Sequence, residues 1–243
     1  MAGEVVYGIN AVREALETGG RVNRLYLARE SRVRDAEALV ELARARRIPF
    51  DFVPQAKLNA LCDTREHQGV AATVSPMAYA DFEECLAHCG AKSLLLALDQ
   101  VQHPKNLGLL VRTAAGSGAS GVLVPARGGA LLDESVVRAS AGTVFRVPIV
   151  NCPNMARALG ALRDAGFWVY GLDGAGEETV FDLPWANRSV LVLGNETGGL
   201  RPGVRKACDA LVRIPLAGGL DSLNVAVAGG VALFQAASRL GLV

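Results

Sequence analysis

Three short segments in the carboxyl-terminal third carry the residue types from which a small-molecule site is built. They read VLVLGNETGGL at 190–200, RIPLAGG at 213–219 and DSLNVAVA at 221–228. Apolar runs long enough for buried strands adjoin Gly, Asn, Thr or Ser, which let a backbone close on a ligand. Strand ends of this kind bind small molecules in α/β proteins. Because Glu196 is the only charged residue between Ser189 and Leu200, the pattern predicts an apolar cofactor pocket with few polar groups.

Two further candidates, Asn106 and Arg112, lie in the segment HPKNLGLLVRTA. Arg112 is the only charged residue between Leu107 and Ala126, so we expect a buried guanidinium that needs an anionic partner. Extension of this arginine to solvent is the alternative. Glu196 is the natural partner if the two loops meet, which spacing alone does not decide. Asn106 follows Pro104 and is expected to cap a helix, although its amide could also hold a substrate or a neighbouring side chain.

The segment after residue 220 predicts a buried helix. Asp221 or Ser222 is expected to cap it, because an uncharged run, VAVAGGVALFQAAS, follows at once. Gly229 and Gly230 lie inside this run, and each costs about 1 kcal/mol of helix stability relative to alanine. We therefore expect another part of the backbone to pack closely there.

Two other patterns suggest chemistry that their context does not support. Gly116, Gly118 and Gly121 have the spacing of a dinucleotide-binding fingerprint, but a helical run precedes them and a strand follows. This is the reverse of the required order, so a helix end and turn is the better interpretation. Cys85, His88 and Cys89 share a helix face, but no second cluster completes a metal site, and packed thiols are expected.

Composition indicates an ordinary folded protein. The 243 residues are 51% hydrophobic, with a net charge of +1, so they lack the basic excess typical of nucleic-acid binders and leave the partner open. No apolar run reaches the roughly 18 residues of a membrane span, and the start lacks the features of a signal peptide. The five cysteines form no CxxC pair, which favours reduced thiols. We expect a cytoplasmic protein.

The texture of the chain predicts two domains. Residues 1–75 suggest a small α/β module, residues 76–92 a linker and the start of the second domain, and residues 93–243 one compact α/β domain. Runs such as SLLLALD, GVLVP, VFRVPIV, FWVYGLD, SVLVLGN and ALVRIPL are apolar on both faces, which is typical of a parallel sheet covered by helices. Six arginines between residues 29 and 47 are interspersed with acidic residues, and the plainest interpretation is a solvated helical face.

Taken together, HPKNLGLLVRTA, LGNETGGL and IPLAGGLDSLNVAVA resemble, in the same order, the three motifs of SpoU RNA 2′-O-ribose methyltransferases in the SPOUT superfamily. YGINAVREALE and HQGV also look like the RNA-binding domain of the bacterial 23S ribosomal-RNA guanosine methyltransferase branch. The resemblance therefore covers nearly the whole chain. One departure is His103, where the first motif usually carries an acidic residue.

The resemblance implies S-adenosylmethionine as methyl donor, a trefoil knot in the second domain, a homodimer, and no metal. It places cofactor contacts at Leu193, Gly194, Ile214, Leu216 and Leu223. The family's motif positions also fall on Asn106, Arg112, Glu196, Ser222 and Asn224.

A guanidinium is effectively never deprotonated in proteins, so we expect Arg112 to hold a phosphate and stabilise the developing alkoxide, with Glu196 orienting it. The remaining motif residues would shape the ribose site. The expected reaction is methylation of an RNA ribose 2′-hydroxyl. The favoured target is a guanosine of large-subunit ribosomal RNA, and transfer RNA is the alternative substrate. A non-catalytic RNA-binding or ribosome-assembly factor of the same fold is an alternative, and a nicotinamide enzyme is a weaker one.

Overall fold

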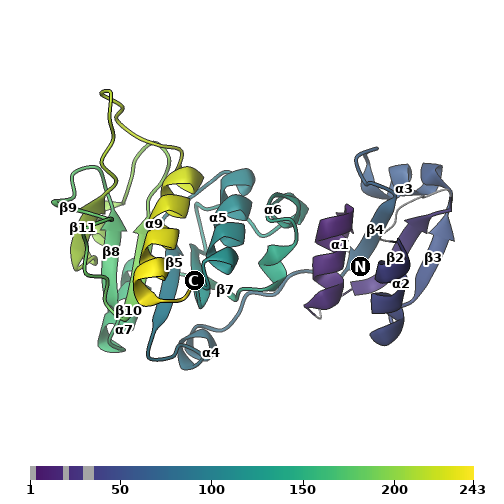
Figure 1. Ribbon diagram of the computed structural model, residues 1–243, viewed down its shortest axis with the longest axis horizontal. Coiled ribbons are helices and arrows are strands. Elements are labelled where there is room, and N and C mark those ends of the chain that lie inside the picture. The colour runs from purple at the N-terminus through teal and green to yellow at the C-terminus, as the bar shows by residue number, and fades with distance from the viewer. Residues whose placement is uncertain (1–3, 19–21, 30–35) are drawn as a thin grey trace. The chain divides into compact units, whose positions relative to one another are not determined.

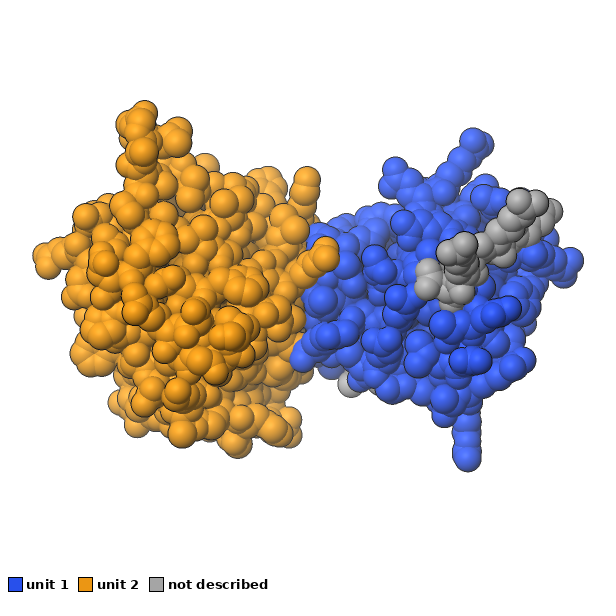
Figure 2. Space-filling model, viewed as in Figure 1, with its two compact units in different colours: residues 1–78, 132–146 blue, residues 79–131, 147–243 orange. Residues whose placement is uncertain are grey.

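A computed structural model of the chain describes residues 4–18, 22–29 and 36–243. The chain divides into two compact units, coloured separately in Figure 2. The first comprises residues 1–78 and 132–146, and the second comprises residues 79–131 and 147–243. In the described part, no helix is both long and apolar enough to cross a membrane.

The first unit is built on a four-stranded mixed sheet. Its strands lie in the order β1 (Glu4–Tyr7), β4 (Val70–Val74), β2 (Val22–Ala28) and β3 (Phe50–Val53). β4 is antiparallel to both of its neighbours, whereas β2 and β3 are parallel. Helices α1 (Ile9–Glu17), α2 (Ala36–Ala45) and α3 (Gln55–Cys62) complete the module. The predicted small α/β module is therefore confirmed.

A segment that we expected in the second domain packs in the first unit instead. Helix α6 (Glu134–Ala139) and the 3-10 helix η1 (Thr143–Phe145) lie between two strands of the second unit in sequence, yet they cluster with the first. Their apolar residues Val136, Val137 and Val144 are buried there. A single domain over residues 93–243 therefore does not describe this segment. The sequence did not reveal this, because a local apolar pattern does not show which core its residues join.

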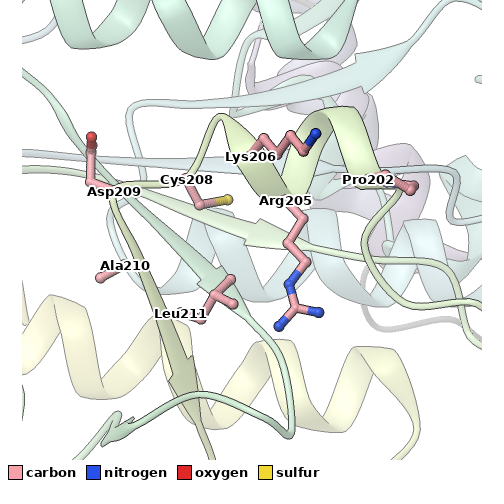
Figure 3. Close-up of a pocket in the computed structure, with 7 residues that line it drawn as sticks. All are labelled: Pro202, Arg205, Lys206, Cys208, Asp209, Ala210 and Leu211. Carbon is pink, nitrogen blue, oxygen red and sulfur yellow. The ribbon is translucent and has the colours of Figure 1, made fainter.

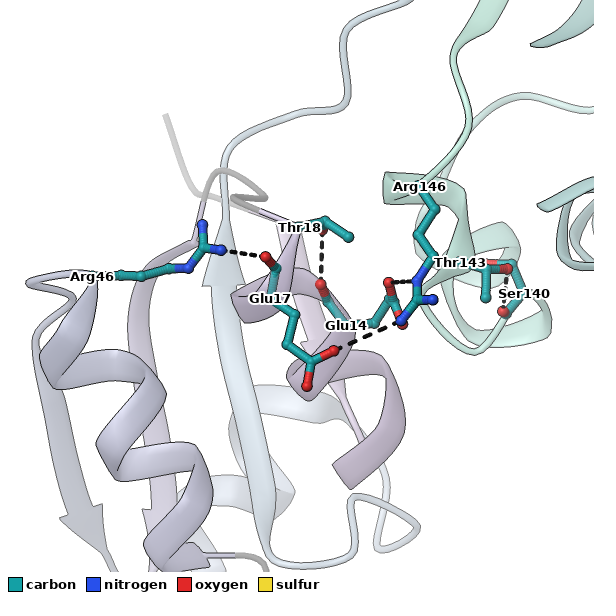
Figure 4. Close-up of polar contacts among 7 residues, drawn as sticks. All are labelled: Glu14, Glu17, Thr18, Arg46, Ser140, Thr143 and Arg146. Atoms are coloured by element: carbon teal, nitrogen blue, oxygen red, sulfur yellow. Dashed lines mark hydrogen bonds and ion pairs between the residues drawn. The ribbon is translucent and has the colours of Figure 1, made fainter. Parts of the chain in front are cut away.

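Ion pairs and one tight turn fix this segment on α1. Arg146 donates to the carboxylate of Glu14 and lies 3.7 Å from that of Glu17 (Figure 4). Gly142 has φ of +85°, and a Cβ atom there would lie 2.9 Å from the carbonyl oxygen of Ala11. Only glycine meets both conditions without strain.

The second unit is built on a seven-stranded sheet in the order β7-β6-β5-β10-β8-β11-β9. All six neighbouring pairs are parallel, which confirms the predicted parallel sheet. The strands are β5 (Ser93–Leu98), β6 (Gly121–Pro125), β7 (Ile149–Cys152), β8 (Trp168–Leu172), β9 (Glu178–Thr179), β10 (Arg188–Leu193) and β11 (Ala210–Arg213). Every residue of β5 is buried, as expected for a strand covered on both faces.

Five helices accompany this sheet: α4 (Phe82–Ala87), α5 (Pro104–Gly116), α7 (Met155–Asp164), α8 (Pro202–Lys206) and α9 (Val225–Leu240). α5 and α9 pack side by side (Figure 1). α7 and α8 pack in one hydrophobic core together with alternate residues of β5 and β10. α9 was expected to be buried all round, but Val227 is 55% and Phe234 46% exposed, so part of its apolar surface faces solvent.

The structure confirms one local pattern and corrects another. The glycines at 116–121 form a helix end and turn, because α5 ends at Gly116 and β6 begins at Gly121. VFRVPIV is not one strand, since its first two residues belong to η1 and only its last two to β7. In the arginine-rich stretch, Arg32 and Arg34 lie outside the described residues. Of the remaining arginines, Arg44 stacks on the ring of Phe50 at 5.5 Å.

Candidate active site

The candidate site lies where the carboxyl ends of β5 and β10 meet. These strands are parallel neighbours, with Leu98 paired to Leu193. The residues that follow each strand therefore emerge at the same edge of the sheet. This register brings Asp99 and Gln100 next to Gly194 and the loop after it, although 95 residues separate Gln100 from Asn195 in sequence.

Asn195 organises the loop that carries Glu196. Its amide donates to the carbonyl of Gln100 at 2.8 Å, and its side-chain oxygen accepts from the backbone N–H groups of Thr197 and Gly198. The loop returns so closely that a Cβ atom on Gly194 would lie 2.2 Å from the backbone of residue 199. The glycine is therefore required by close approach, and the loop presents Glu196 in one position.

Three distant motifs meet through a chain of side-chain hydrogen bonds. Asn106 donates through Nδ2 to Oε1 of Glu196 at 2.9 Å. Asn224 donates through Nδ2 to Oδ1 of Asn106 at 3.2 Å. The side-chain oxygen of Asn224 in turn accepts from the N–H of Ala226 at 2.9 Å and so caps α9. The structure therefore brings together three of the five predicted motif residues.

The capping roles differ from those expected. Asn106 lies in the first turn of α5, and the N-cap position of that helix is His103 instead. The Asn106 side chain is buried, with 9% exposure. Asn224 caps α9 in place of Asp221 or Ser222. Ser222 is exposed and makes no hydrogen bond with the described part of the chain. Asn224 therefore both caps α9 and bonds to Asn106, whereas Asn106 bridges two side chains and caps no helix.

Arg112 is exposed, which corrects the prediction of a buried guanidinium. Within residues 4–18, 22–29 and 36–243 it makes no ion pair or hydrogen bond, and Glu196 bonds to Asn106 instead. Six residues separate Asn106 from Arg112, which places their side chains roughly 120° apart around a helix of 3.6 residues per turn. The expected orientation of Arg112 by Glu196 is therefore absent.

The predicted cofactor residues divide into two groups. Ile214, Leu216 and Leu223 are partly exposed apolar residues in the loop before α9. Leu193 is 1% exposed, and its carbonyl accepts from the N–H of Asp99 at 2.7 Å, so neither its side chain nor that group is free. Gly194 must be glycine because the backbone of residue 199 approaches it closely. The three loop residues fit an apolar ligand, whereas Leu193 fits a supporting role.

An ion pair beneath the site went unrecognised in the sequence. The carboxylate of Asp99 has no exposed surface, and it accepts from the backbone N–H of Arg201 at 2.8 Å and from Nε of the same residue at 2.7 Å. Such a pair ties the end of β5 to the residue before α8. The available signal was an aspartate directly after an otherwise apolar buried strand, which requires a partner.

Two cavities of the second unit lie away from the predicted cofactor residues. One, of about 430 Å³, is lined at the start of β11 by seven residues shown in Figure 3: Pro202, Arg205, Lys206, Cys208, Asp209, Ala210 and Leu211. Burial raises the pKa of the Cys208 thiol to about 12, so it stays protonated. The other, of about 420 Å³, lies at the carboxyl ends of β6 and β7.

The cysteines of α4 and its end serve packing. Cys85 is buried in the core of the second unit, and burial raises the pKa of its thiol to about 11. Its sulfur lies where a Cβ atom on Gly121 would come within 2.6 Å. Among the residues with described structure, no group of three or more His, Cys, Asp or Glu side chains is placed to hold a metal ion.

Comparison with known proteins decides the family. Residues 93–234 match the SpoU rRNA methylase family, and residues 5–80 match the substrate-binding family of RNA 2′-O ribose methyltransferases. The chain belongs to the SpoU rRNA methylase family. A relative from Mycolicibacterium vanbaalenii, named an uncharacterized tRNA/rRNA methyltransferase, is 40% identical over 97% of this chain and 76% of its own.

Two solved methyltransferase structures share the fold over nearly the full length of this chain. The methyltransferase AviRb from Streptomyces viridochromogenes, in complex with AdoMet, is 30% identical with a TM-score of 0.81, covering 97% of this chain and 89% of its own. An AdoMet-bound rRNA methyltransferase from Sinorhizobium meliloti is 29% identical with a TM-score of 0.81, covering 98% and 88%. These matches confirm the fold class and the family; the trefoil knot stays a prediction.

Proposed function

We propose that this SpoU-family chain transfers a methyl group from S-adenosylmethionine to a ribose 2′-hydroxyl of RNA, with a guanosine of large-subunit ribosomal RNA as the favoured target. The observation that carries the proposal is the hydrogen-bonded chain from Asn224 through Asn106 to Glu196, which joins all three motifs. AdoMet in two similar structures supports the choice of cofactor.

The residues at this edge fit the adenosyl group. Partly exposed apolar side chains at Ile214, Leu216 and Leu223 could cover an aromatic base. Gly218 and Gly219 between them have φ of +70° and +72°, and a Cβ atom on either would meet nothing within 4 Å. Leu193 and Gly194 would support this surface from beneath. When bound, S-adenosylmethionine supplies an activated methyl group on a sulfonium centre.

The protein's own residues would align the hydroxyl and neutralise charge. Arg112 is exposed and has no described partner, so it can bind the phosphate beside the reacting ribose and stabilise the developing alkoxide. Glu196 and Asn224 hold the Asn106 amide in one orientation, and with Ser222 these residues would shape the ribose site. Alignment of this kind accounts for much of the barrier reduction when the methyl donor is already activated.

The test is transfer of labelled methyl from S-adenosylmethionine to protein-free ribosomal RNA and, separately, to transfer RNA. Wild type, Arg112→Lys and Arg112→Ala are compared, and nuclease digestion locates the methyl group. We expect 2′-O-methyl on ribosomal RNA, partial activity for lysine and a loss of at least a hundredfold for alanine. Equal loss in both variants with intact cofactor binding would show that the fork geometry of the guanidinium matters more than its charge.

Transfer RNA is the second candidate substrate, because the Mycolicibacterium relative carries both RNA classes in its name. Label on transfer RNA alone would move the substrate assignment. No label on either RNA would favour the non-catalytic assembly factor. We propose that the first unit binds the RNA, since residues 5–80 match the substrate-binding family. Folded RNA is recognised mainly through its shape and phosphates.

We also propose that the protein acts as a homodimer in the cytoplasm. Exposed apolar residues, Leu109 on α5 and Val227 and Phe234 on α9, lie on a pair of helices that pack together. A second copy covering them would remove this apolar surface from water. All five cysteines are free, which suits a reducing compartment. Light scattering of wild type and Phe234→Asp tests the dimer: we expect the variant to be a monomer, and an unchanged mass would contradict the proposed interface.

A further inference from the structure

The cavity at the carboxyl ends of β6 and β7 has the character of an anion site. It is about 420 Å³ in volume and is lined by Pro125 at the end of β6, Cys152 at the end of β7, the first residues of α7 and the residues around the start of α8. Two arginines, Arg127 and Arg201, line it as well, and no acidic side chain does. A concave surface with two positive charges and no negative one attracts anions.

The two arginines differ in how far their charge is already balanced. Arg201 uses Nε and Nη2 for the carboxylate of Asp99, while its side chain is still 44% exposed. Arg127 is exposed and makes no hydrogen bond or ion pair with any residue of the described ranges. The charge of Arg127 is therefore not compensated by a described partner, whereas the guanidinium of Arg201 is fixed in position by Asp99.

The cavity also includes the beginning of α7, a helix of ten residues. Asn154 caps it by accepting from the N–H of Arg157 at 3.1 Å, and Met155 and Ala156 line the cavity. The N–H groups of a first turn lack partners within the helix and carry partial positive charge. These groups add to the arginines, and phosphate is an anion that such a combination binds well.

Hydrogen bonds connect the cavity to the candidate active site. Arg201 bonds to Asp99, which precedes Gln100, and the carbonyl of Gln100 accepts from Asn195 in the loop that carries Glu196. A ligand at Arg201 would therefore lie next to the residues that hold that loop. All of these groups belong to the second unit and to the same edge of its sheet.

We propose that this cavity, called here the Arg127 cavity, binds a backbone phosphate of the RNA substrate. The inference rests on the proposed function and deepens it, because it assigns to the second unit a phosphate contact apart from Arg112. Lys206 offers a matched control. It lines the other cavity, at the start of β11 and so at the opposite edge of the sheet, and it too makes no polar contact within the described ranges.

The experiment measures the affinity of the full chain for protein-free ribosomal RNA and for transfer RNA over a series of salt concentrations. Wild type, Arg127→Ala, Arg127→Lys and Lys206→Ala are compared. For Arg127→Ala we expect roughly a threefold to tenfold loss of affinity and a log-log salt slope shallower by about 0.7 to 0.9, the value of one phosphate contact. Arg127→Lys should retain the wild-type slope, and Lys206→Ala should leave both quantities unchanged.

Equal effects of Arg127→Ala and Lys206→Ala would overturn the proposal, because general surface charge would then explain both. The affinity of wild type and Arg127→Ala for inorganic phosphate is measured as well. If Arg127→Ala changes this affinity but leaves RNA binding unchanged, the cavity binds a small phosphate ligand and the proposal is overturned. These readouts are binding constants and need no methyl transfer, so they separate failure of this inference from failure of the proposed reaction. Unchanged binding of S-adenosylmethionine in every variant confirms that the loop carrying Glu196 has stayed intact.

Discussion

Replacing Asn106 with aspartate removes the donor of its hydrogen bond to Glu196 while preserving side-chain shape. In the wild type, Nδ2 of Asn106 donates to Oε1 of Glu196 at 2.9 Å. In Asn106→Asp, two carboxylate oxygens would face each other at that distance. At an effective dielectric constant of about 20, the repulsion between two charges so close is on the order of 5 kcal/mol. The contact to Asn224 survives, because an aspartate oxygen still accepts.

Proton uptake limits this penalty. A carboxyl group with an ordinary pKa of about 4 can stay protonated at pH 7 at a cost of about 4 kcal/mol, which is the smaller figure. Glu196 is only partly buried, so solvent screening reduces the expected loss to between about 1 and 4 kcal/mol. The folded variant binds a proton that the unfolded chain releases above pH 4. Its stability relative to wild type therefore falls as the pH rises from about 4 to 7.

Urea denaturation of wild type and Asn106→Asp at pH 5 and pH 7.5 measures this difference. The control is the double variant Asn106→Asp with Glu196→Gln, in which the glutamine amide donates to the aspartate and the net charge of the pair is restored. We expect the double variant to recover most of the stability and to lose the pH dependence. If it is no more stable than Asn106→Asp, or if the single variant shows no pH dependence, the hydrogen bond does not hold the site together.

Two further predictions concern packing and pH. Gly229→Ala should destabilise the protein by roughly 1 to 2 kcal/mol, because its Cβ atom would lie 2.4 Å from Cδ2 of Leu110. Gly230→Ala meets nothing nearer than 3.7 Å and should be neutral or stabilising by up to about 1 kcal/mol, so thermal denaturation of this pair gives opposite signs. His67 is buried, and desolvation lowers its pKa; its Nδ1 accepts from the N–H of Gly69 at 3.0 Å, which favours the neutral ring. Stability should therefore decline as the pH falls from about 6.5 toward this lowered value, and His67→Gln should flatten that decline in denaturation curves over pH 5 to 7.5.

The parallel sheet was predictable because its signal is local. Strands such as β5 and β10 are apolar on both faces, and the runs SLLLALD and SVLVLGN show this without any knowledge of their neighbours. The turn at Gly118 was predictable for the same reason, since the order of helix and strand around it is visible in the chain. Its φ of +73° is one that glycine adopts readily.

The sequence predicts part of the candidate site but not its pairing. Three of the five motif residues, Asn106, Glu196 and Asn224, are joined by hydrogen bonds, whereas Arg112 and Ser222 form no described hydrogen bond with them. The sequence also pairs Glu196 with Arg112, but the carboxylate accepts from Asn106. Charge complementarity suggested the first pairing, whereas the geometry of α5 decides the second. The first turn of the helix points its amide at the loop after β10, while a residue six positions later lies on another side. Which side of a helix faces a distant loop depends on tertiary packing that composition does not encode.

The segment at residues 132–146 shows the same limit on a larger scale. Its valines are as apolar as those of any core strand, so pattern alone joins them to the sheet on either side. They pack in the first unit because Gly142 permits contact with α1 and Arg146 meets the carboxylates of Glu14 and Glu17. The chain thus passes between the units three times, at residues 78, 131 and 146. Deletion of residues 1–75 would expose Val136, Val137 and Val144, so RNA binding by the first unit is better tested by substituting exposed arginines than by truncation.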